Sequence, residues 1–447
     1  MPLVLALLML AAVLVPLTAA AQTGETWVTA WAGSGQGPYP VGNPSAQPDL
    51  RLAFPDPRAG ARDQTFRLIV PPDIWGRQTR LRFSNAFGTG PVTLDGVHVG
   101  LQLGGPALIP GTNAAATFGG HPGVTIAPGD VVWSDPIDLP FWRGDAAALA
   151  GRRLAVSFHV AGESGPMTWH AKALTTSYVG APGTGATGHL EDESALPFST
   201  TSWYFLDAVD MRAPAGTRLV VAFGDSITDG TASTLNGEDR WPNVLARRLH
   251  AIHGGSVAVV NAGIGGNQVT GPKSYSPQQP FAGGPSAPDR LERDVLSLSG
   301  VSTVIWLEGI NDFSRNGNAT AGAVETAMRE VVGRIRARIP GVRVVGATLT
   351  SALGSSSPAH GFAEQDAKRR ALNDVIRASD LFDGVIDFDG ATLDPQTGGL
   401  RAELVPDSTT GGPGDRLHPN RAGYLAMGQA IDLGTLMTTA ATGRNSP

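Results

Sequence analysis

The sequence predicts two consecutive domains: a β-rich domain of the β-sandwich or jelly-roll kind, then a doubly wound α/β domain. In the first half, short alternating runs of apolar residues are separated by turn formers, as in sandwiches and jelly rolls. In the second half, near-continuous apolar runs alternate with helical periodicity, which is typical of a parallel sheet covered by helices. The Pro and Gly residues of 212–218 (RAPAGTR) mark the change and predict domains at 22–213 and 214–447.

Size and composition indicate a globular protein. The chain has 447 residues, of which 42% are hydrophobic and 16% charged, with a formal net charge of -6 and no cysteine. No basic stripe is present, which argues against a nucleic-acid partner. The lack of cysteine removes disulfides, thiolate metal sites and cysteine nucleophiles together. We expect no metal and no cofactor. Five histidines of the first half lack metal-ligand spacing, so we expect them to have structural or surface roles: His98, His121, His159, His170 and His189.

The first 21 residues predict a signal peptide. They are apolar and end in small residues suited to signal-peptidase cleavage. Pro16 and the Ala-rich end argue against a spanning helix. Because no Lys or Arg precedes the apolar core, an uncleaved membrane anchor is the alternative. No other stretch approaches the ~20 apolar residues of a membrane span, so we expect a secreted or periplasmic protein without stable membrane insertion.

The first half predicts several short strands and few helices. The clearest candidates are the alternating runs at 79–84, 92–101, 123–126 and 153–160. Such a domain either binds a polymeric substrate or forms a wall of the active-site cleft, and the sequence leaves both open. An exposed row of its tryptophans would favour sugar stacking, but we expect most of them in the core or at the domain interface.

The second half predicts five buried parallel strands joined by helices. The strands are expected at 218–223, 257–261, 302–307, 342–348 and 384–388. Pro242 suits the first turn of a helix, and an apolar stripe over 321–339 gives the clearest helix. Further helices are expected at 362–379 and from Asn420 through 436.

Ser226 is the candidate nucleophile. The first strand of this half ends at Gly224, and Asp225 and Ser226 follow. A buried strand that stops there presents the serine at the carboxyl edge of a parallel sheet, where ligands of open α/β sheets usually bind.

A serine hydroxyl needs a base and a group that orients the base. Three of the four histidines in this half belong to a helix end or a Ser-rich loop: His250, His253 and His360. His418 lies just before the last predicted helix, three residues after Asp415. The Asp415 carboxylate can therefore hold the Nδ1–H of His418, which leaves Nε2 to face Ser226.

Two further strand ends offer donors for a developing oxyanion. The second strand runs into NAGIGGN at 261–267, where glycines let backbone N–H groups approach a ligand closely. The third runs into EGIND at 308–312, where the Asn311 side chain is a further donor. Each of these clusters follows a strand or precedes a helix, so all can converge on one edge of the sheet.

The pattern around Ser226 differs from that of ordinary α/β-hydrolases, because Thr228 stands where G-x-S-x-G has its second glycine. The clusters instead resemble the SGNH family, also called GDSL hydrolases. The resemblance covers four motifs: GDSI at 224–227, the glycine cluster at 261–266, GIND at 309–312, and D-x-x-H at 415–418. The segment WVTAWA at 27–32 also looks like the start of the β-domain that precedes the catalytic domain in many secreted bacterial members.

The resemblance implies a flavodoxin-like, three-layer SGNH-hydrolase domain with carboxylic ester hydrolase activity. It implies that Ser226 is the nucleophile, His418 the base and Asp415 its orienting acid. The implied oxyanion donors are the backbone N–H groups of Ser226 and Gly266 and the Asn311 side chain. Counting from Asn261 favours Gly266, with two alternatives if the loop is registered differently: Gly263 and Gly265.

The expected reaction is a two-step acyl transfer to water through an acyl-enzyme on Ser226. Short acyl esters are the expected substrates, and acetyl esters of carbohydrates are one candidate class. Lysophospholipase or lipase-type activity and acyl transfer to an alcohol would use the same triad. A degenerate, non-catalytic carbohydrate-binding protein is a further alternative, against which the intact residue set argues. The Pro/Gly-rich loop at 270–288 is expected to shape the pocket.

Overall fold

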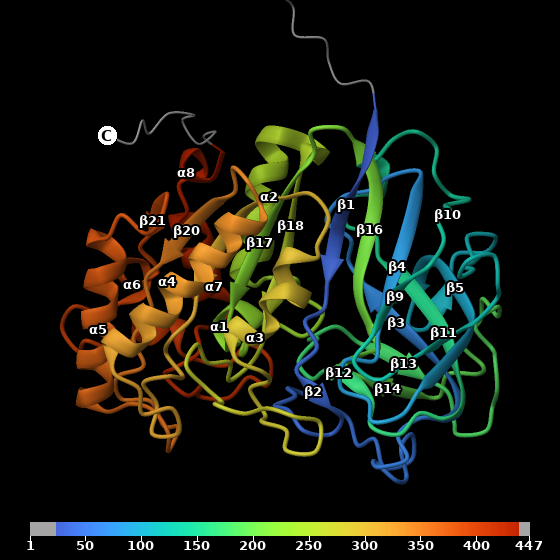
Figure 1. Cartoon of the computed structure of the whole chain (residues 1–447), viewed down its shortest axis with the longest axis horizontal. Helices are drawn as coiled ribbons and strands as arrows, with labels where there is room; N and C mark the ends of the chain where they lie inside the picture. Colours follow the sequence, from blue (N-terminus) through green and yellow to red (C-terminus); the bar gives the residue numbers. More distant parts are fainter. Residues whose placement is uncertain (1–23, 438–447) are drawn as a thin grey trace, which may run out of the picture.

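The computed structural model describes residues 24–437, so the predicted signal peptide at 1–21 lies outside the described residues. An antiparallel β half and an α/β half lie side by side (Figure 1). The chain passes from one to the other between β16 (Leu206–Pro214) and β17 (Arg218–Gly224). The predicted order of a β-rich domain and an α/β domain is confirmed, while the bounds 22–213 and 214–447 stay a prediction.

The amino-terminal half consists of antiparallel sheets. One sheet has the order β1 (Glu25–Ala32), β16, β4 (Gln78–Ser84), β10 (Ile137–Asp138), with β9 (Val131–Trp133) also paired to β4. The larger sheet has the order β14 (Phe198–Thr200), β13 (Ser177–Val179), β3 (Arg62–Val70), β11 (Leu154–Glu163), β5 (Val92–Gly104), β6 (Ala107–Leu108), with β7 (Ala114–Ala115) and β8 (Val124–Ile126) also on β5. A small sheet joins β15 (Trp203–Tyr204), β12 (Thr168–His170) and β2 (Gly37–Pro38). All four predicted strands are present, as β4, β5, β8 and β11. That the connectivity is a jelly roll stays a prediction.

Aromatic side chains fill the core of this half. The rings of Phe66 and Phe158 stack with centroids 5.2 Å apart and planes 4° from parallel. Trp31 and Trp203 are buried and meet edge to face at 4.8 Å. Among the described residues no tryptophan is exposed. The prediction that most tryptophans are core or interface residues is therefore confirmed, and the described surface has no tryptophan row for sugar stacking.

The carboxy-terminal half contains one parallel sheet of five strands. Its order is β18 (Val257–Gly263), β17, β19 (Val301–Leu307), β20 (Arg343–Ala347), β21 (Gly384–Ile386). In order of sequence this is 2-1-3-4-5, the order of flavodoxin-like doubly wound sheets. Gly224 at the end of β17 is aligned with Gly263 of β18 and Leu307 of β19. The ends of these three strands therefore lie beside one another, as the sequence predicts.

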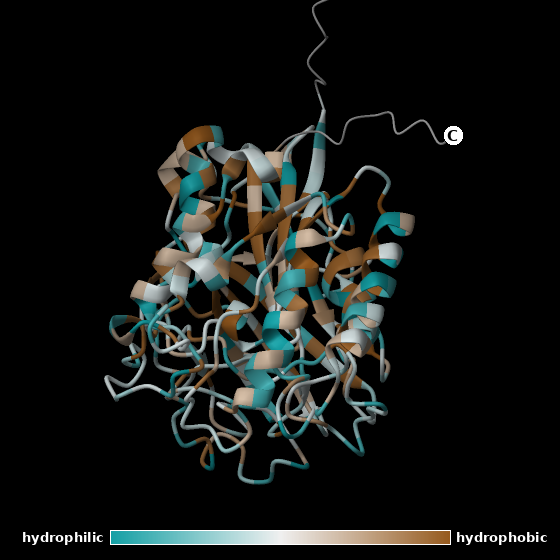
Figure 2. Ribbon diagram, turned by 90° about the vertical axis from the view of Figure 1, so that its left-hand side faces the viewer, coloured by the Kyte–Doolittle hydropathy of each residue, from teal (hydrophilic) through white to brown (hydrophobic). Residues whose placement is uncertain are grey.

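Helices flank this sheet in two groups. One group is α2 (Trp241–His253), α6 (Phe388–Thr392) and α7 (Arg421–Ala430), and the other is α3 (Ala287–Leu291), α4 (Ala321–Arg338) and α5 (Ala363–Ala378). In Figure 2, which faces this half, the central strands are mostly hydrophobic and the helices in front of them alternate hydrophilic and hydrophobic residues. Within 24–437 no helix is long and apolar enough to cross a membrane.

The prediction of one continuous helix from Asn420 through 436 is wrong in one respect. The chain forms two helices there, α7 and α8 (Leu433–Met437). Ile431 adopts an extended conformation (φ -72°, ψ 118°), which ends α7. The Asp432 carboxylate then accepts the Gly434 N–H at 3.0 Å and starts the second helix.

The amino-terminal half covers the outer edge of the parallel sheet. Strand β1 lies along the edge strand β18 (Figure 1). The Thr29 N–H donates to the Ser299 carbonyl at 3.0 Å, and the Val259 N–H donates to the Asp73 carboxylate at 2.6 Å. An edge strand with unpaired backbone groups is a liability in a free domain, and here the neighbouring domain satisfies part of that edge.

Candidate active site

The turn after β17 places Ser226 at the edge of the sheet. Ser226 is the first residue of the one-turn helix α1 (Ser226–Asp229), and Asp225 caps that helix by accepting the Ile227 N–H at 2.9 Å. Gly224 is required by close packing, because a Cβ there would lie 2.1 Å from Thr228 Oγ1 and 2.6 Å from the Leu307 carbonyl. The Ser226 side chain is almost fully buried in the protein but opens into a pocket of about 360 Å³.

His418 and Asp415 complete a hydrogen-bonded chain with Ser226. The Ser226 hydroxyl lies 2.8 Å from His418 Nε2, and His418 Nδ1 lies 2.6 Å from Asp415 Oδ2. The other oxygen of Asp415 accepts the backbone N–H groups of Leu417 and His418, both at 2.9 Å. The structure thus brings together the three residues that the sequence singled out as nucleophile, base and orienting acid.

The charge state of Asp415 favours this arrangement. Burial alone would raise the pKa of Asp415, but the hydrogen bond and charge of His418 and the two backbone N–H groups together lower it below its ordinary value. An ionised carboxylate can only accept a hydrogen bond. His418 therefore carries a proton on Nδ1, and its Nε2 is free to accept the Ser226 proton.

The glycine loop after β18 contains one backbone donor without an acceptor. The Gly263 N–H donates to Asn261 Oδ1 at 2.9 Å, and the Gly265 N–H donates to Asp229 Oδ2 at 3.0 Å. The Gly266 N–H has no acceptor among the described residues, and Gly266 lines the same pocket as Ser226. Its φ of +81° is a conformation that favours glycine. Of the three glycines that the sequence left open, Gly266 is the one that lines this pocket with an unpaired N–H among the described residues.

Two more donors face this pocket. The Ser226 N–H begins α1 and has no acceptor among the described residues. Asn311 also lines the pocket, and its Nδ2 donates one hydrogen bond to the Asn267 carbonyl at 2.9 Å. That bond fixes the amide plane, and the second N–H of Nδ2 stays available. All five predicted site residues therefore lie around one pocket.

Comparison with known protein families identifies this half of the chain. Residues 222–426 match the GDSL-like lipase/acylhydrolase family. These residues form a GDSL-like acylhydrolase domain. This match supports carboxylic ester hydrolase activity for the domain.

Solved structures of esterases are similar to about half of this chain. A carbohydrate acetylesterase from Sinorhizobium meliloti is 18% identical, with a TM-score of 0.34, over 48% of this chain and 96% of its own. A putative arylesterase from Agrobacterium tumefaciens is 21% identical, with a TM-score of 0.36, over 48% and 95%. An aryl esterase from M. smegmatis is 19% identical, with a TM-score of 0.36, over 48% and 95%. The comparison with curated proteins gave no match.

Arg290 forms hydrogen bonds at the ends of the three strands that carry Ser226, Gly266 and Asn311. Its guanidinium donates to the carbonyls of Gly224 and Ala262, each at 2.8 Å, and to Glu308 at 3.0 Å. These three partners belong to the ends of β17, β18 and β19, or follow them directly. Asp294 provides a further ion pair at 2.9 Å. Sequence reasoning missed this residue, because nothing in the local sequence PDRLE at 288–292 indicates partners 18 to 66 residues away.

A group of buried carboxyls surrounds Arg290. Burial raises the pKa of Asp225 to about 7, and burial together with the charge of Asp225 raises the pKa of Glu308 well above its ordinary value. One oxygen of each carboxyl, Asp225 Oδ2 and Glu308 Oε2, has no hydrogen-bond partner among the described residues. Asp312 is satisfied, because it accepts hydrogen bonds from Val269 and Thr270 and so fixes the loop after the oxyanion glycines.

The amino-terminal domain reaches into the GDSL site. Asn43 and Lys172 line the pocket beside Ser226. The Lys172 ammonium donates to Thr231 Oγ1 at 2.6 Å, and burial lowers the pKa of Lys172. Of the two roles that the sequence left open for this domain, these contacts favour the wall of the active-site cleft.

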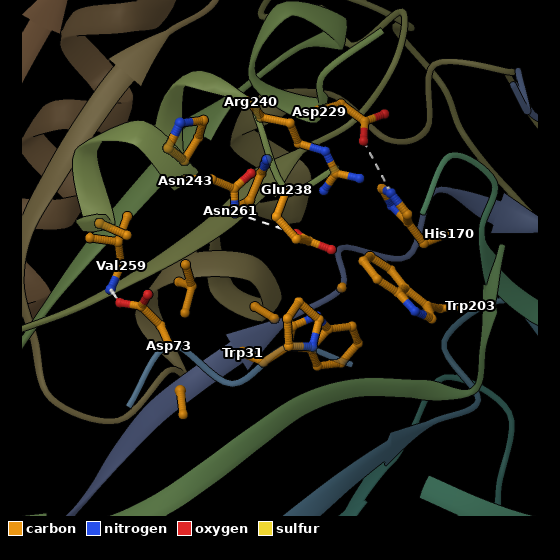
Figure 3. A pocket seen from close by; sticks show the side chains of 17 residues that line it. Trp31, Asp73, His170, Trp203, Asp229, Glu238, Arg240, Asn243, Val259 and Asn261 are labelled. Atoms are coloured by element: carbon orange, nitrogen blue, oxygen red, sulfur yellow. Dashed lines mark hydrogen bonds and ion pairs between the residues drawn. The ribbon is translucent and has the colours of Figure 1, made fainter. Parts of the chain in front are cut away.

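His170 is a second such contact, and it has one of the two predicted roles, a structural one. Its Nε2 lies 3.2 Å from Asp229 Oδ1 across the domain junction, and its Nδ1 lies 2.7 Å from the Ser34 carbonyl. Figure 3 shows this pair beside Trp203 at the wall of a separate cavity of about 50 Å³ between the domains. Ser226 does not line that cavity, so it is not the substrate pocket.

His360 is a further pocket residue that sequence reasoning set aside. The sequence around His360 shows only a Ser-rich loop, but the structure places His360 on the wall that also holds Ser226 and His418. The loop at 270–288 contributes Phe281, Ala282 and Gly283 to the pocket, in line with its expected role. In the described part of the chain, no cluster of three His, Asp or Glu side chains is placed to hold a metal ion.

Proposed function

We propose that the protein is a secreted serine esterase that hydrolyses short-chain carboxylic esters through an acyl-enzyme on Ser226. The observation that carries this proposal is the continuous hydrogen-bonded chain from Ser226 Oγ through His418 to Asp415, with links of 2.8 and 2.6 Å. Secretion rests on the apolar composition of residues 1–21 alone.

In the first step Ser226 Oγ bonds to the ester carbonyl carbon and its proton passes to His418 Nε2. The carbonyl oxygen becomes an oxyanion, which accepts hydrogen bonds from the Ser226 and Gly266 backbone and the Asn311 side chain. Asp415 stabilises the imidazolium that forms. The tetrahedral intermediate then collapses, the bond to the alcohol oxygen breaks, and His418 gives its proton to the departing alcohol.

In the second step water attacks the acyl-enzyme. His418 removes a proton from this water, the same three donors hold the second oxyanion, and the bond to Ser226 Oγ breaks. The serine regains its proton from His418 and the carboxylic acid leaves. Besides the ester and one water molecule, no reactant from outside the chain is needed to balance these steps.

The polar character of the pocket supports a small acyl group on a polar alcohol, such as the acetyl ester of a carbohydrate. Its wall carries several hydrogen-bonding side chains besides the triad and the oxyanion donors, among them Asn43, Lys172, Gln268, Ser314 and His360. Phe281 and Leu417 are its largest apolar side chains. A long acyl chain would need an extended apolar lining, which favours short-chain esterase activity over lipase or lysophospholipase activity.

A series of p-nitrophenyl esters tests the proposal. With the purified protein we expect kcat/KM to be highest for acetate or butyrate and to fall with longer acyl chains. Ser226→Ala, which keeps the pocket shape, is the matched control and should be inactive on every ester. Activity of Ser226→Ala equal to that of the unaltered protein would contradict the proposal. Product analysis with glycerol as acceptor separates hydrolysis from acyl transfer.

A further inference from the structure

His360 lies in the pocket but has no place in the triad or the oxyanion hole. It belongs to the loop between β20 and α5, and its side chain is 7% exposed. It lines the pocket together with Ser226 and His418. A histidine so close to the reacting atoms needs a defined protonation state, because a second base or cation there would disturb His418.

Gln365 fixes the position of the ring proton. The Gly361 N–H donates to Gln365 Oε1 at 2.8 Å, which identifies the oxygen of this side-chain amide. The amide nitrogen Nε2 then faces His360 Nδ1 at 2.6 Å and the Ile310 carbonyl at 3.3 Å. An amide nitrogen can only donate, so His360 Nδ1 must accept. A neutral imidazole that accepts at Nδ1 carries its proton on Nε2.

The surroundings keep this ring neutral. Burial, followed by the charge of His418, lowers the pKa of His360 to about 4, against the smaller opposing effect of Asp415. The hydrogen bond to Gln365 uses Nδ1, His360 Nε2 has no hydrogen-bond partner among the described residues, and His360 lines the pocket. His360 thus presents one N–H donor, in a fixed tautomer, to whatever occupies the pocket.

The reaction geometry indicates which part of an ester this donor meets. The carbonyl oxygen is already assigned to the backbone N–H groups of Ser226 and Gly266 and to Asn311. The alcohol leaves on the side of His418, because His418 Nε2 returns the proton to it. His360 lies near enough to His418 for the charge of one ring to affect the other, and Ser357 of the same loop also lines the pocket.

We propose that His360 is a specificity-determining residue, whose Nε2–H donates a hydrogen bond to an oxygen of the alcohol part of the ester. The substrate class is then an ester of an alcohol with further oxygen acceptors, such as a polyol or a sugar, and not of a plain alkyl alcohol. Gln365 is a positioning residue, because it sets the tautomer of His360. This inference rests on the proposed esterase function and deepens it.

Two acetate esters that differ only in the alcohol test this inference. We would compare kcat/KM for glycerol monoacetate and hexyl acetate in the unaltered protein and in His360→Phe, which keeps a flat aromatic ring and removes the donor. We expect His360→Phe to lower kcat/KM for glycerol monoacetate about tenfold, the effect of one neutral hydrogen bond, and to leave hexyl acetate within about twofold. His360→Gln, which restores an N–H donor, should recover part of the loss. His189→Phe, at an exposed histidine outside the pocket, is the matched control.

Gln365→Glu tests the tautomer separately from the fold. A carboxylate at this position accepts from Nδ1 and stabilises the imidazolium, so Nε2 carries a proton only when the whole ring is protonated. The ratio of kcat/KM for glycerol monoacetate to kcat/KM for hexyl acetate should be independent of pH from 6 to 9 in the unaltered protein. In Gln365→Glu it should fall as the pH rises. The ¹⁵N chemical shifts of the His360 ring should report a proton on Nε2 in the unaltered protein.

The outcomes separate this inference from the esterase proposal. An unchanged substrate ratio in a folded His360→Phe variant, or an equal loss on both esters, would overturn the role of His360 and leave the esterase proposal intact. Full activity of Ser226→Ala on hexyl acetate would instead overturn the esterase proposal. If His360→Phe does not fold, the ratio and its pH dependence in Gln365→Glu decide.

Discussion

His170 Nε2 in the amino-terminal domain lies 3.2 Å from Asp229 Oδ1 at the end of the helix that begins with Ser226. The other oxygen of Asp229 accepts the Gly265 N–H at 3.0 Å. Burial alone would raise the pKa of Asp229, but the charge and hydrogen bond of His170, with the nearby Lys172, lower it. The carboxylate is therefore ionised, and through it the amino-terminal domain holds the backbone next to Gly266.

Replacement of His170 should weaken oxyanion stabilisation without removing the substrate pocket. His170→Phe keeps a ring that can stack on Trp203, as the imidazole does at 5.4 Å, but loses both hydrogen bonds. We expect kcat to fall on the order of tenfold, because a displaced donor loses much of its effect, with little change in KM. His98→Phe, at a histidine of the same domain that does not line the pocket, should keep full activity. An unchanged kcat in His170→Phe would show that the domain contact does not position the oxyanion loop.

The triad residues should act as one unit. Ser226→Ala and His418→Ala should each lower kcat by roughly 10⁴ to 10⁶, and the double variant should lose hardly more than either single variant. Asp415→Asn should also lower kcat strongly, because an amide at this position no longer favours the Nδ1–H tautomer of His418. Steady-state kinetics on p-nitrophenyl acetate measure these effects. Additive losses in the double variant would contradict a shared mechanism.

The oxyanion donors should contribute mainly to kcat. Asn311→Ala should lower kcat by about 10² to 10³. Asn316 lines the same pocket but is exposed, so Asn316→Ala is the matched control and should change kcat little. If both asparagine variants behave alike, the Asn311 side chain has no special role in the reaction.

Gly266→Ala should lower kcat for a different reason. Its φ of +81° disfavours any residue with a Cβ, and a Cβ here would lie 3.3 Å from both Asn43 Nδ2 and Gly283 Cα. We expect the loop to shift and the backbone donor to move away from the oxyanion, with a loss at least as large as that in Asn311→Ala. The circular dichroism spectrum should stay unchanged. If the kinetics of Gly266→Ala are close to those of the unaltered protein, another residue provides the backbone donor for the oxyanion.

The parts of the fold and site that depend on local pattern could be predicted from the sequence. The placement of Ser226, the glycine cluster at 261–267 and Asn311 follows from one rule, that the carboxyl ends of parallel strands meet at one edge. The choice of Gly266 within that cluster comes from the family resemblance. The D-x-x-H spacing likewise puts Asp415 and His418 on one turn. These predictions needed no knowledge of how distant segments pack.

What could not be predicted depends on packing between distant segments. Arg290 reaches Gly224 across 66 residues, and His170 reaches Asp229 across 59. An isolated arginine or histidine in the sequence does not reveal such partners. His360 was set aside for the same reason, since its role depends on Gln365 in the next helix and on the position of its loop against His418. The break between α7 and α8 depends on a single extended residue, Ile431, for which helical periodicity has no signal.

The buried carboxyl of Asp225 should make stability depend on pH. The pKa of Asp225 is about 7 in the folded protein because of burial, and near its ordinary value of 3.8 in the unfolded chain. Between these values the folded state binds more protons than the unfolded state. The contribution of Asp225 to the free energy of unfolding is therefore fully present below about pH 4. It declines as the pH rises to about 7 and is constant above that.

Asp225→Asn removes this titration and keeps a side-chain oxygen that can accept the Ile227 N–H. Above pH 7 the unaltered protein holds a buried carboxylate whose Oδ2 has no partner, whereas the amide carries no charge. One unit of pKa shift corresponds to about 1.4 kcal/mol, so we expect the variant to be more stable than the unaltered protein at pH 8 by at least about that amount. The difference in stability should shrink toward pH 5. Because Glu308 also has a raised pKa, the stability of the variant should keep a smaller pH dependence. Guanidinium denaturation of both proteins at pH 5 and pH 8 measures the effect. A stability difference that is the same at both pH values would mean that Asp225 stays ionised in the folded protein.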